Sequence, residues 1–431
     1  MYKIETEICD MLDENTYITK LDNGLKIYIC KKKGFKKKIG MFGTKYGSVI
    51  NDFVDITTGE RIKVPDGIAH FLEHKLFEKE GANALDMFSK IGVSSNAYTS
   101  FDQTVYYFET SNKFEESIKL LVNLIKEPYF TVENVAKEQG IIGQEIMMYD
   151  DDPGSVVYMN TLAAMYQKNN VRIDIAGTIE SISHITKDLL YTCYNTFYNP
   201  NNMFFIVVGD VDVEATIKLI DENVKKYEAN KKHYLKEVET FNEEEPDGIY
   251  QKEISKNMDI FMPLMCVGYK LDIVHKEEIV KRALVADIIS DMYFSKISEF
   301  FKTEYDKGVL TDKIAFMYEG TDTFSHVILS SESTKINELQ KDLFQYINKI
   351  KNENIDEELF KTIKNNKIGA LVSISDSLNV SYRRIIDSIL CGIDVYADVN
   401  LINDITKDDV KEFLNMLVDE KRVVSLVMPN K

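Results

Sequence analysis

The sequence predicts an α+β protein of two homologous domains, each an antiparallel-rich sheet covered on one side by helices. Strand-like alternating runs are mixed with helical patterns of ten or more residues. A helix-then-strand pattern at 183–208 recurs at 403–427, where Ile185 and Ile405 occupy the same place. A charged stretch at 229–247 that is poor in apolar residues separates the two copies. We therefore expect domains at 1–228 and 248–431, joined by this linker.

The first domain opens with two strand-like runs, at 24–29 and 39–42. The lysine-rich segment 31–38 between them predicts a solvated hairpin tip, with docking to an acidic partner as the alternative. A helix is expected at 65–78, with Asp66 as its N-cap. Further strands are expected at 93–99, 104–107 and 203–208, and a second long helix at 133–145.

The helix expected at 65–78 carries His70 and His74, two of only six histidines in the chain. Positions i and i+4 share a helix face, so both imidazoles can reach one ion, and Glu73 points into the same space. Two neutral imidazoles suit zinc, and a nearby carboxylate can accept a proton from zinc-bound water. The alternative is a helix whose histidines only cap or pack.

The helix expected at 133–145 supplies a candidate third ligand. Glu138 and Glu145 lie two helical turns apart and project from the same side. Two carboxylates along a mostly buried helix repel each other unless a cation is present. A zinc ion beside Glu145, with Glu138 orienting another ligand, removes that objection. The alternative is an ordinary acidic helix face.

The second copy has no such residues at the matching places. Aligning Ile142 and Gly143 on Ile368 and Gly369 puts Lys364 in place of Glu138 and Leu371 in place of Glu145. The counterpart of the histidine helix falls near 286–293, which contains no histidine. The first domain is therefore expected to hold the metal and the second to be noncatalytic.

The overall composition is acidic, with a formal net charge of −18 at pH 7. That charge argues against nucleic acid or an anionic membrane as a general partner. Five cysteines without a Cys-x-x-Cys pair indicate free thiols in a reducing compartment. The start of the chain does not have the pattern of a signal peptide, and no apolar run is long enough to span a bilayer. A cytoplasmic protein is expected.

His-x-x-Glu-His at 70–74, followed about seventy residues later by Glu-x6-Glu, resembles the pitrilysin-type zinc peptidases, or inverzincins. Similar local patterns occur at 95–100, 104–107, 151–153 and 197–203. The chain is closest in length to the half-length branch that includes the mitochondrial processing peptidase beta subunit. The resemblance implies that His70, His74 and Glu145 bind one zinc. It also implies Glu73 as general base and Glu138 as the carboxylate behind a ligand.

The resemblance further implies an endopeptidase that hydrolyses peptides or unfolded segments in an enclosed chamber. A peptide would add as an extra strand to the edge containing Asn96, Ala97, Tyr98 and Thr99. The alternative for this segment is an ordinary core strand.

Family members often hold the substrate with an Arg and a Tyr two helical turns apart. The nearest residues here, Tyr382, Arg383 and Arg384, are adjacent instead. Either the pair is rearranged or a partner supplies it, and a plain polar helix face is the other interpretation.

Two repeats would need a partner to close the chamber, either a second copy or a related subunit that lacks zinc ligands. The competing function is a noncatalytic structural or assembly subunit, as in the respiratory-complex core proteins of this fold. The intact set of metal-ligand residues favours the enzyme, because a purely structural subunit has no physical need for Glu73.

Overall fold

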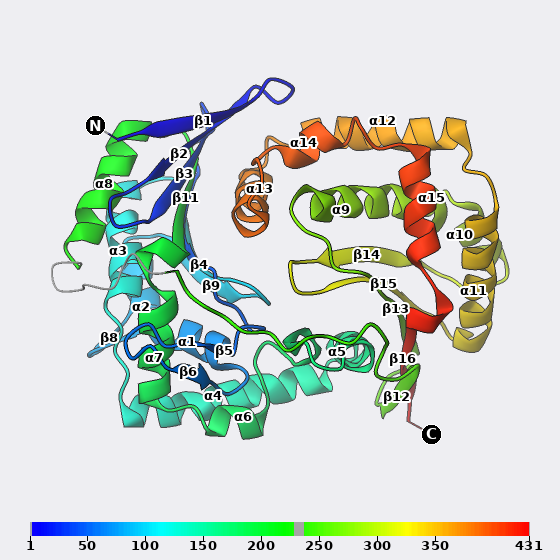
Figure 1. Ribbon diagram of the computed structural model, residues 1–431, viewed down its shortest axis with the longest axis horizontal. Coiled ribbons are helices and arrows are strands. Elements are labelled where there is room, and N and C mark those ends of the chain that lie inside the picture. Colours follow the sequence, from blue (N-terminus) through cyan, green and yellow to red (C-terminus); the bar gives the residue numbers. More distant parts are fainter. Residues whose placement is uncertain (1, 228–236, 431) are drawn as a thin grey trace. The chain divides into compact units, whose positions relative to one another are not determined.

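The computed structural model describes residues 2–227 and 237–430, which divide into two compact units (Figure 1). The first unit contains Met1–Ile146, Asp174–Asn242 and Ile374–Leu390, and the second contains Met147–Ile173, Glu243–Ser373 and Cys391–Lys431. Each unit has its own sheet and its own hydrophobic core. The linker predicted at 229–247 lies partly outside the described residues.

The first unit is built on a seven-stranded sheet that is antiparallel except where its third and fourth strands pair in parallel. In spatial order its strands are β1 (Ile4–Cys9), β2 (Glu14–Lys20), β3 (Lys26–Lys31), β11 (Met203–Gly209), β4 (Lys38–Thr44), β10 (Thr104–Thr110) and β9 (Ser94–Thr99). Two small ribbons accompany it, β5 (Asp52–Val54) with β6 (Arg61–Lys63) and β7 (Glu78–Lys79) with β8 (Ala82–Asn83).

The helices of the first unit come from two distant parts of the sequence. They are α1 (Ile68–Phe77), α2 (Ala84–Lys90), α3 (Phe114–Lys126), most of α4 (Val132–Asp151), α6 (Ile179–Ser183), α7 (Lys187–Phe197), the short turn Pro200–Asn202, α8 (Val213–Lys225) and all but the last residue of α13 (Leu378–Cys391). Helix α13 is far from the others in sequence, yet it belongs to this unit.

The second unit is built on a five-stranded sheet, again with a single parallel pair. Its strands are, in spatial order, β12 (Glu253–Met258), β16 (Arg422–Pro429), β13 (Leu264–Lys270), β15 (Ser325–Glu332) and β14 (Ala315–Gly320). Its helices are α5 (Pro153–Met165), α9 (Glu277–Ile289), the continuing turn Ser290–Phe294, α10 (Glu299–Asp306), α11 (Ile336–Asn352), α12 (Glu357–Ile374), α14 (Ala397–Leu401) and α15 (Lys407–Met416). Single turns at Asn170–Arg172 and Asp419–Lys421 complete it.

The two sheets share one topology. The order β3-β11-β4-β10-β9 of the first unit matches β12-β16-β13-β15-β14 of the second, strand for strand in chain order. In both, the first and last strands of the five pair in parallel. Helices α7 and α15, which precede the last strands, both start after a threonine N-cap. The predicted α+β fold with two homologous domains is confirmed.

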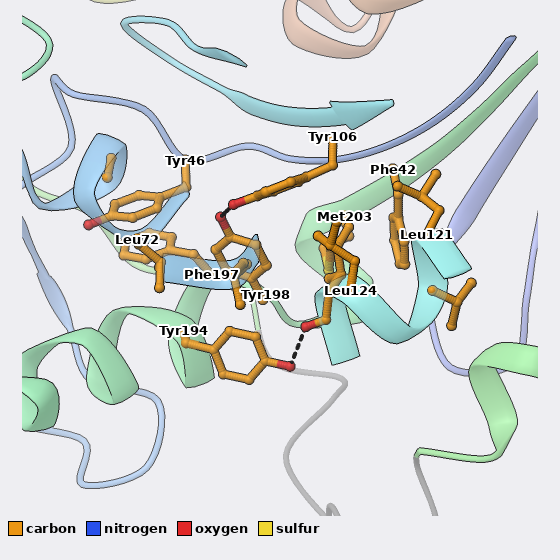
Figure 2. Close-up of a cluster of buried hydrophobic side chains, with 14 of the residues drawn as sticks. Phe42, Tyr46, Leu72, Tyr106, Leu121, Leu124, Tyr194, Phe197, Tyr198 and Met203 are labelled. Atoms are coloured by element: carbon orange, nitrogen blue, oxygen red, sulfur yellow. Dashed lines mark hydrogen bonds between the residues drawn. The ribbon is translucent and has the colours of Figure 1, made fainter. Parts of the chain in front are cut away.

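The core of the first unit anchors α1 against the sheet and its neighbouring helices. Figure 2 shows Leu72 of α1 among aromatic side chains from the strands and from α7. Two buried hydroxyls in this cluster, those of Tyr106 and Tyr198, lie 2.9 Å apart, and Tyr194 donates to the carbonyl of Ile125 at 2.8 Å. Because these hydroxyls are hydrogen-bonded, they can be buried without a large desolvation cost. This packing holds α1 in place, and with it the side chains on the helix face that points away from the core.

Two local predictions are wrong. Segment 31–38 is not a hairpin tip, because β11 lies between β3 and β4, and Lys32 is buried against Glu14 and the carbonyl of Ser375. Asp66 does not cap α1. Its carboxylate instead accepts a hydrogen bond from Asn51 at 2.6 Å.

Within residues 2–227 and 237–430, no helix combines the length and apolar character that crossing a bilayer requires.

Candidate metal centre

Helix α1 begins at a glycine that its surroundings require. Gly67 has φ of 87°, in the left-handed region. A Cβ at this position would collide with the carbonyl oxygen of Ala176, so no other residue fits without a backbone shift. Phe71, Leu72 and Leu76 then point into the core. The helical period leaves His70 and His74 together on the face toward α4.

His70, His74 and Glu145 come together between α1 and α4. The Nε2 atom of His70 lies 3.8 Å from one carboxylate oxygen of Glu145, and the Nε2 atom of His74 lies 3.5 Å from the other. One ligand atom from each residue lies within 4.8 Å of the others. Two imidazoles and one carboxylate are a donor set that suits zinc, with a fourth position left for water or substrate. The residues present therefore fit this metal.

The charge state of His70 also suits a metal ligand. Burial, and then the neighbouring His74, lower the pKa of His70 to about 4, although Glu145 and Glu138 oppose this. The imidazole is therefore neutral at neutral pH before any metal binds, and a neutral imidazole can donate a lone pair.

Glu138 lies behind His74, as the sequence predicts. The Nδ1 atom of His74 is 3.1 Å from Oε1 of Glu138. This contact favours the tautomer that carries its proton on Nδ1 and leaves Nε2 free for a metal. Burial alone would raise the pKa of Glu138, but contacts with His74 and Lys75 outweigh it and hold the pKa below its usual range. Glu138 is therefore a carboxylate at neutral pH.

Glu73 is buried beside the three candidate ligands, with 7% of its surface exposed. The hydroxyl of Thr99 on β9 donates to its Oε2 atom at 2.6 Å. Burial, assisted by Glu145, raises the pKa of Glu73, while Thr99 and His74 act in the opposite direction. A raised pKa makes a carboxylate a stronger base at neutral pH.

The segment containing Asn96, Ala97, Tyr98 and Thr99 forms β9, the outermost strand of the first sheet. Among the described residues, only one side of β9 pairs with a strand, β10. Because Thr99 touches Glu73, this edge runs up to the candidate site.

The three residues of α13 that were considered for substrate contact have different neighbours. Tyr382 and Arg383 are close enough to Tyr98 to influence it. Burial raises the pKa of Tyr98, Tyr382 raises it further, and Arg383 opposes the change. Arg384 is buried and lies near Cys9 of β1, the opposite edge strand. Tyr382 and Arg383 thus influence the edge strand that carries Thr99, while Arg384 influences Cys9.

Lys75 is a residue to which the sequence pattern assigns no role. It follows His74 directly, it is completely buried, and its ammonium reaches Glu138. The signal for it was present, since a lysine stands between the apolar core positions Leu72 and Leu76.

Two family descriptions match long stretches of this chain. Residues 48–179 match the family described as insulinase (peptidase family M16), and residues 184–367 match the family described as peptidase M16 inactive domain. The three candidate ligands and Glu73 all fall within the first match.

Two similar proteins match nearly the whole chain, and a third matches about half of it. The uncharacterized zinc protease YmfH of Bacillus subtilis is 37% identical over 425 residues, 97% of this chain and 98% of that protein. The crystal structure of an M16-like peptidase from Alicyclobacillus acidocaldarius superposes with a TM-score of 0.89 at 29% identity, covering 100% of this chain and 99% of that one. The mitochondrial-processing peptidase subunit beta of Caenorhabditis elegans is 27% identical over 215 residues, 48% of this chain and 44% of that one. This chain belongs to peptidase family M16.

Proposed function

We propose that this protein is a zinc-dependent endopeptidase. The observation that carries the proposal is the convergence of His70, His74 and Glu145 beside a buried Glu73. A cluster of three metal ligands alone does not show that the bound metal would be catalytic. A basic carboxylate next to three ligands, with a coordination position to spare, is what hydrolysis requires.

Zinc, when bound, would polarise a peptide carbonyl and lower the pKa of a water molecule. Glu73 would accept a proton from that water as it attacks the carbonyl carbon, and would then pass the proton to the leaving amine. The hydroxyl of Thr99 would hold Glu73 in place through its hydrogen bond at 2.6 Å. Glu138 would fix the ring of His74.

The substrate is proposed to be a peptide or an unfolded protein segment. Strand β9 offers an edge beside Glu73 that no strand of the described residues occupies. Main-chain hydrogen bonding to such an edge binds extended peptides with little dependence on sequence. Tyr382 and Arg383 are near enough to Tyr98 on that strand to influence its pKa, which supports a substrate contact from this chain as well as from a partner.

Cleavage is proposed to take place in the cytoplasm, within a chamber closed by a second copy or by a related subunit without zinc ligands. An isolated monomer in solution that cleaves peptides at the full rate without an added partner would contradict the partner part of this proposal.

The test is the Glu73→Gln variant. It is expected to keep zinc and to lose about a hundredfold to ten-thousandfold in the rate of peptide hydrolysis, because the amide keeps the shape but cannot accept a proton. Glu80→Gln, a change of the same kind at an exposed position, is the matched control and should leave the rate unaltered. Near-normal turnover in Glu73→Gln would show that another group activates the water. A wild-type protein that binds zinc but cleaves no peptide would favour a noncatalytic assembly subunit.

A further inference from the structure

Lys75 has no exposed surface, which is unusual for a lysine. Burying an ammonium is costly unless it is paired and hydrogen-bonded. Lys75 contacts the carboxylate of Glu78, which directly follows α1, the carbonyl of Asn134 at 3.2 Å and Oε2 of Glu138 at 3.5 Å. Two of these three partners lie on α4, across from α1.

The carboxylate of Glu138 is shared between two consecutive residues of α1. Its Oε1 atom is 3.1 Å from Nδ1 of His74, and its Oε2 atom is 3.5 Å from the ammonium of Lys75. Consecutive residues of a helix point about 100° apart, so the two contacts reach Glu138 from different directions. Together they restrict both the position and the rotation of this carboxylate.

We propose that Lys75 is a positioning residue for the metal centre. By holding Oε2 of Glu138, it keeps Oε1 on Nδ1 of His74, and Nε2 of His74 stays directed at the space shared with His70 and Glu145. An apolar residue at position 75 could fill the same volume, but Oε2 would lose its cationic neighbour in a buried place. This inference rests on the proposed function, because it assumes that the site binds zinc.

The expected effect is on metal affinity, independent of catalysis. Loss of an outer partner behind a metal-bound histidine typically costs about tenfold to a hundredfold in affinity. Lys75→Met, which removes the ammonium and keeps a similar length, should lower zinc affinity by about that factor. Competition with a chromophoric chelator measures the affinity, and the visible absorption of the cobalt(II)-loaded protein reports the ligand geometry.

A double-mutant cycle separates positioning from general stability. If Lys75 acts through Glu138, then Lys75→Met should lower zinc affinity in the wild-type background but by less than about twofold in a Glu138→Gln background. Equal losses in both backgrounds would overturn the proposal. Lys79→Met is the matched control, since the ammonium of Lys79 donates to the carbonyls of Leu124 and Glu127. That variant should keep wild-type zinc affinity and the wild-type cobalt spectrum.

Two further outcomes are distinguished by the same measurements. If the wild-type protein binds no zinc, the proposed function fails first. If the wild type binds zinc and a folded Lys75→Met variant binds it equally well, only the role of Lys75 is wrong. Should circular dichroism show that Lys75→Met does not fold, Lys75→Gln takes its place in the cycle, with the same expected and contrary results.

Discussion

The two units place a pair of residues four apart on equivalent helices and surround the pairs with different chemistry. In the first unit, α1 carries His70 and His74, and α4 brings Glu145 to them. In the second, α9 and the turn that continues it carry Asp287 and Asp291, and Lys367 of α12 lies 3.5 Å and 3.0 Å from them. In the first arrangement the paired side chains are imidazoles that could bind an external cation, whereas in the second they are carboxylates paired with a lysine ammonium. Both units keep the fold, and among residues 2–227 and 237–430 a cluster of three possible metal ligands occurs in the first unit alone.

The helices that complete the two arrangements are fastened in the same way. Gln139 of α4 donates to the carbonyls of Ile182, Ser183 and Ile185, just before α7. Lys364 of α12 donates to the carbonyls of Asn403 and Ile405, just before α15. These contacts pair Lys364 with Gln139, one residue away from the alignment that the sequence suggests.

The largest expected effects test whether the two units are separate in function although alike in packing. Phe71→Ala on α1 and Ile288→Ala on α9 each remove a fully buried side chain. Each should cost about 2–5 kcal/mol of unfolding free energy, measured by chemical denaturation. Only Phe71→Ala should also weaken zinc binding, because α1 carries two of the ligands. If both variants lose zinc to the same degree, the site depends on both units, and the two units are not separate in function.

A smaller effect is expected at the contact between β9 and the proposed base. Thr99→Val removes a hydrogen bond to a carboxylate, which is typically worth about 1.5–3 kcal/mol, so peptide hydrolysis should fall roughly tenfold to a hundredfold while zinc is retained. Thr99 lowers the pKa of Glu73, so its loss should move the acidic limb of the pH–rate profile to higher pH. Thr99→Ser keeps the hydroxyl and should behave as wild type. An unchanged profile in Thr99→Val would mean that the hydroxyl does not act on Glu73.

The smallest effect is expected in the second unit, at Glu319. Burial would raise the pKa of Glu319, but His326 and the hydroxyl of Tyr158 outweigh it, and the pKa is lowered. A carboxyl whose pKa is lower in the folded state stabilises the fold above its unfolded pKa, and this contribution is lost as pH falls through the folded pKa. The side chain is 41% exposed, so solvent screening keeps the term small. In acid titrations of thermal stability, Glu319→Gln should show a slightly shallower decline below about pH 4.5 than wild type. A steeper decline would reverse the assigned sign.

Much of the candidate metal centre could be proposed from the sequence because its geometry follows from helical spacing. His70 with His74, and Glu138 with Glu145, are each set by the period of one helix, and the pairing of α1 with α4 follows from the family resemblance. The structure brings all four side chains together. The edge position of Thr99 was likewise expected, and the strand indeed lies at the sheet edge.

Other features depend on contacts between distant segments, which local patterns do not encode. The insertion of β11 between β3 and β4 joins residues far apart in the chain, and so does the burial of Lys32 against Ser375. The same holds for α13, which comes late in the sequence but belongs to the first unit. Aspartate is a common N-cap residue, but here the N-cap position is next to the carbonyl of Ala176, where only glycine fits. Gly67 therefore occupies that position, and Asp66 accepts a hydrogen bond from Asn51 instead.

The most direct measurement of the central claim is the zinc content of three purified proteins: wild type, His74→Ala and Asp291→Ala. His74 and Asp291 are each the second member of a pair four residues apart, on α1 and on the turn that continues α9. We expect about one zinc per chain in wild type and in Asp291→Ala, and close to none in His74→Ala, because within the described part of the chain only the first unit brings imidazole and carboxylate groups around one point. Zinc that stays in His74→Ala, or that is lost in Asp291→Ala, would contradict the account.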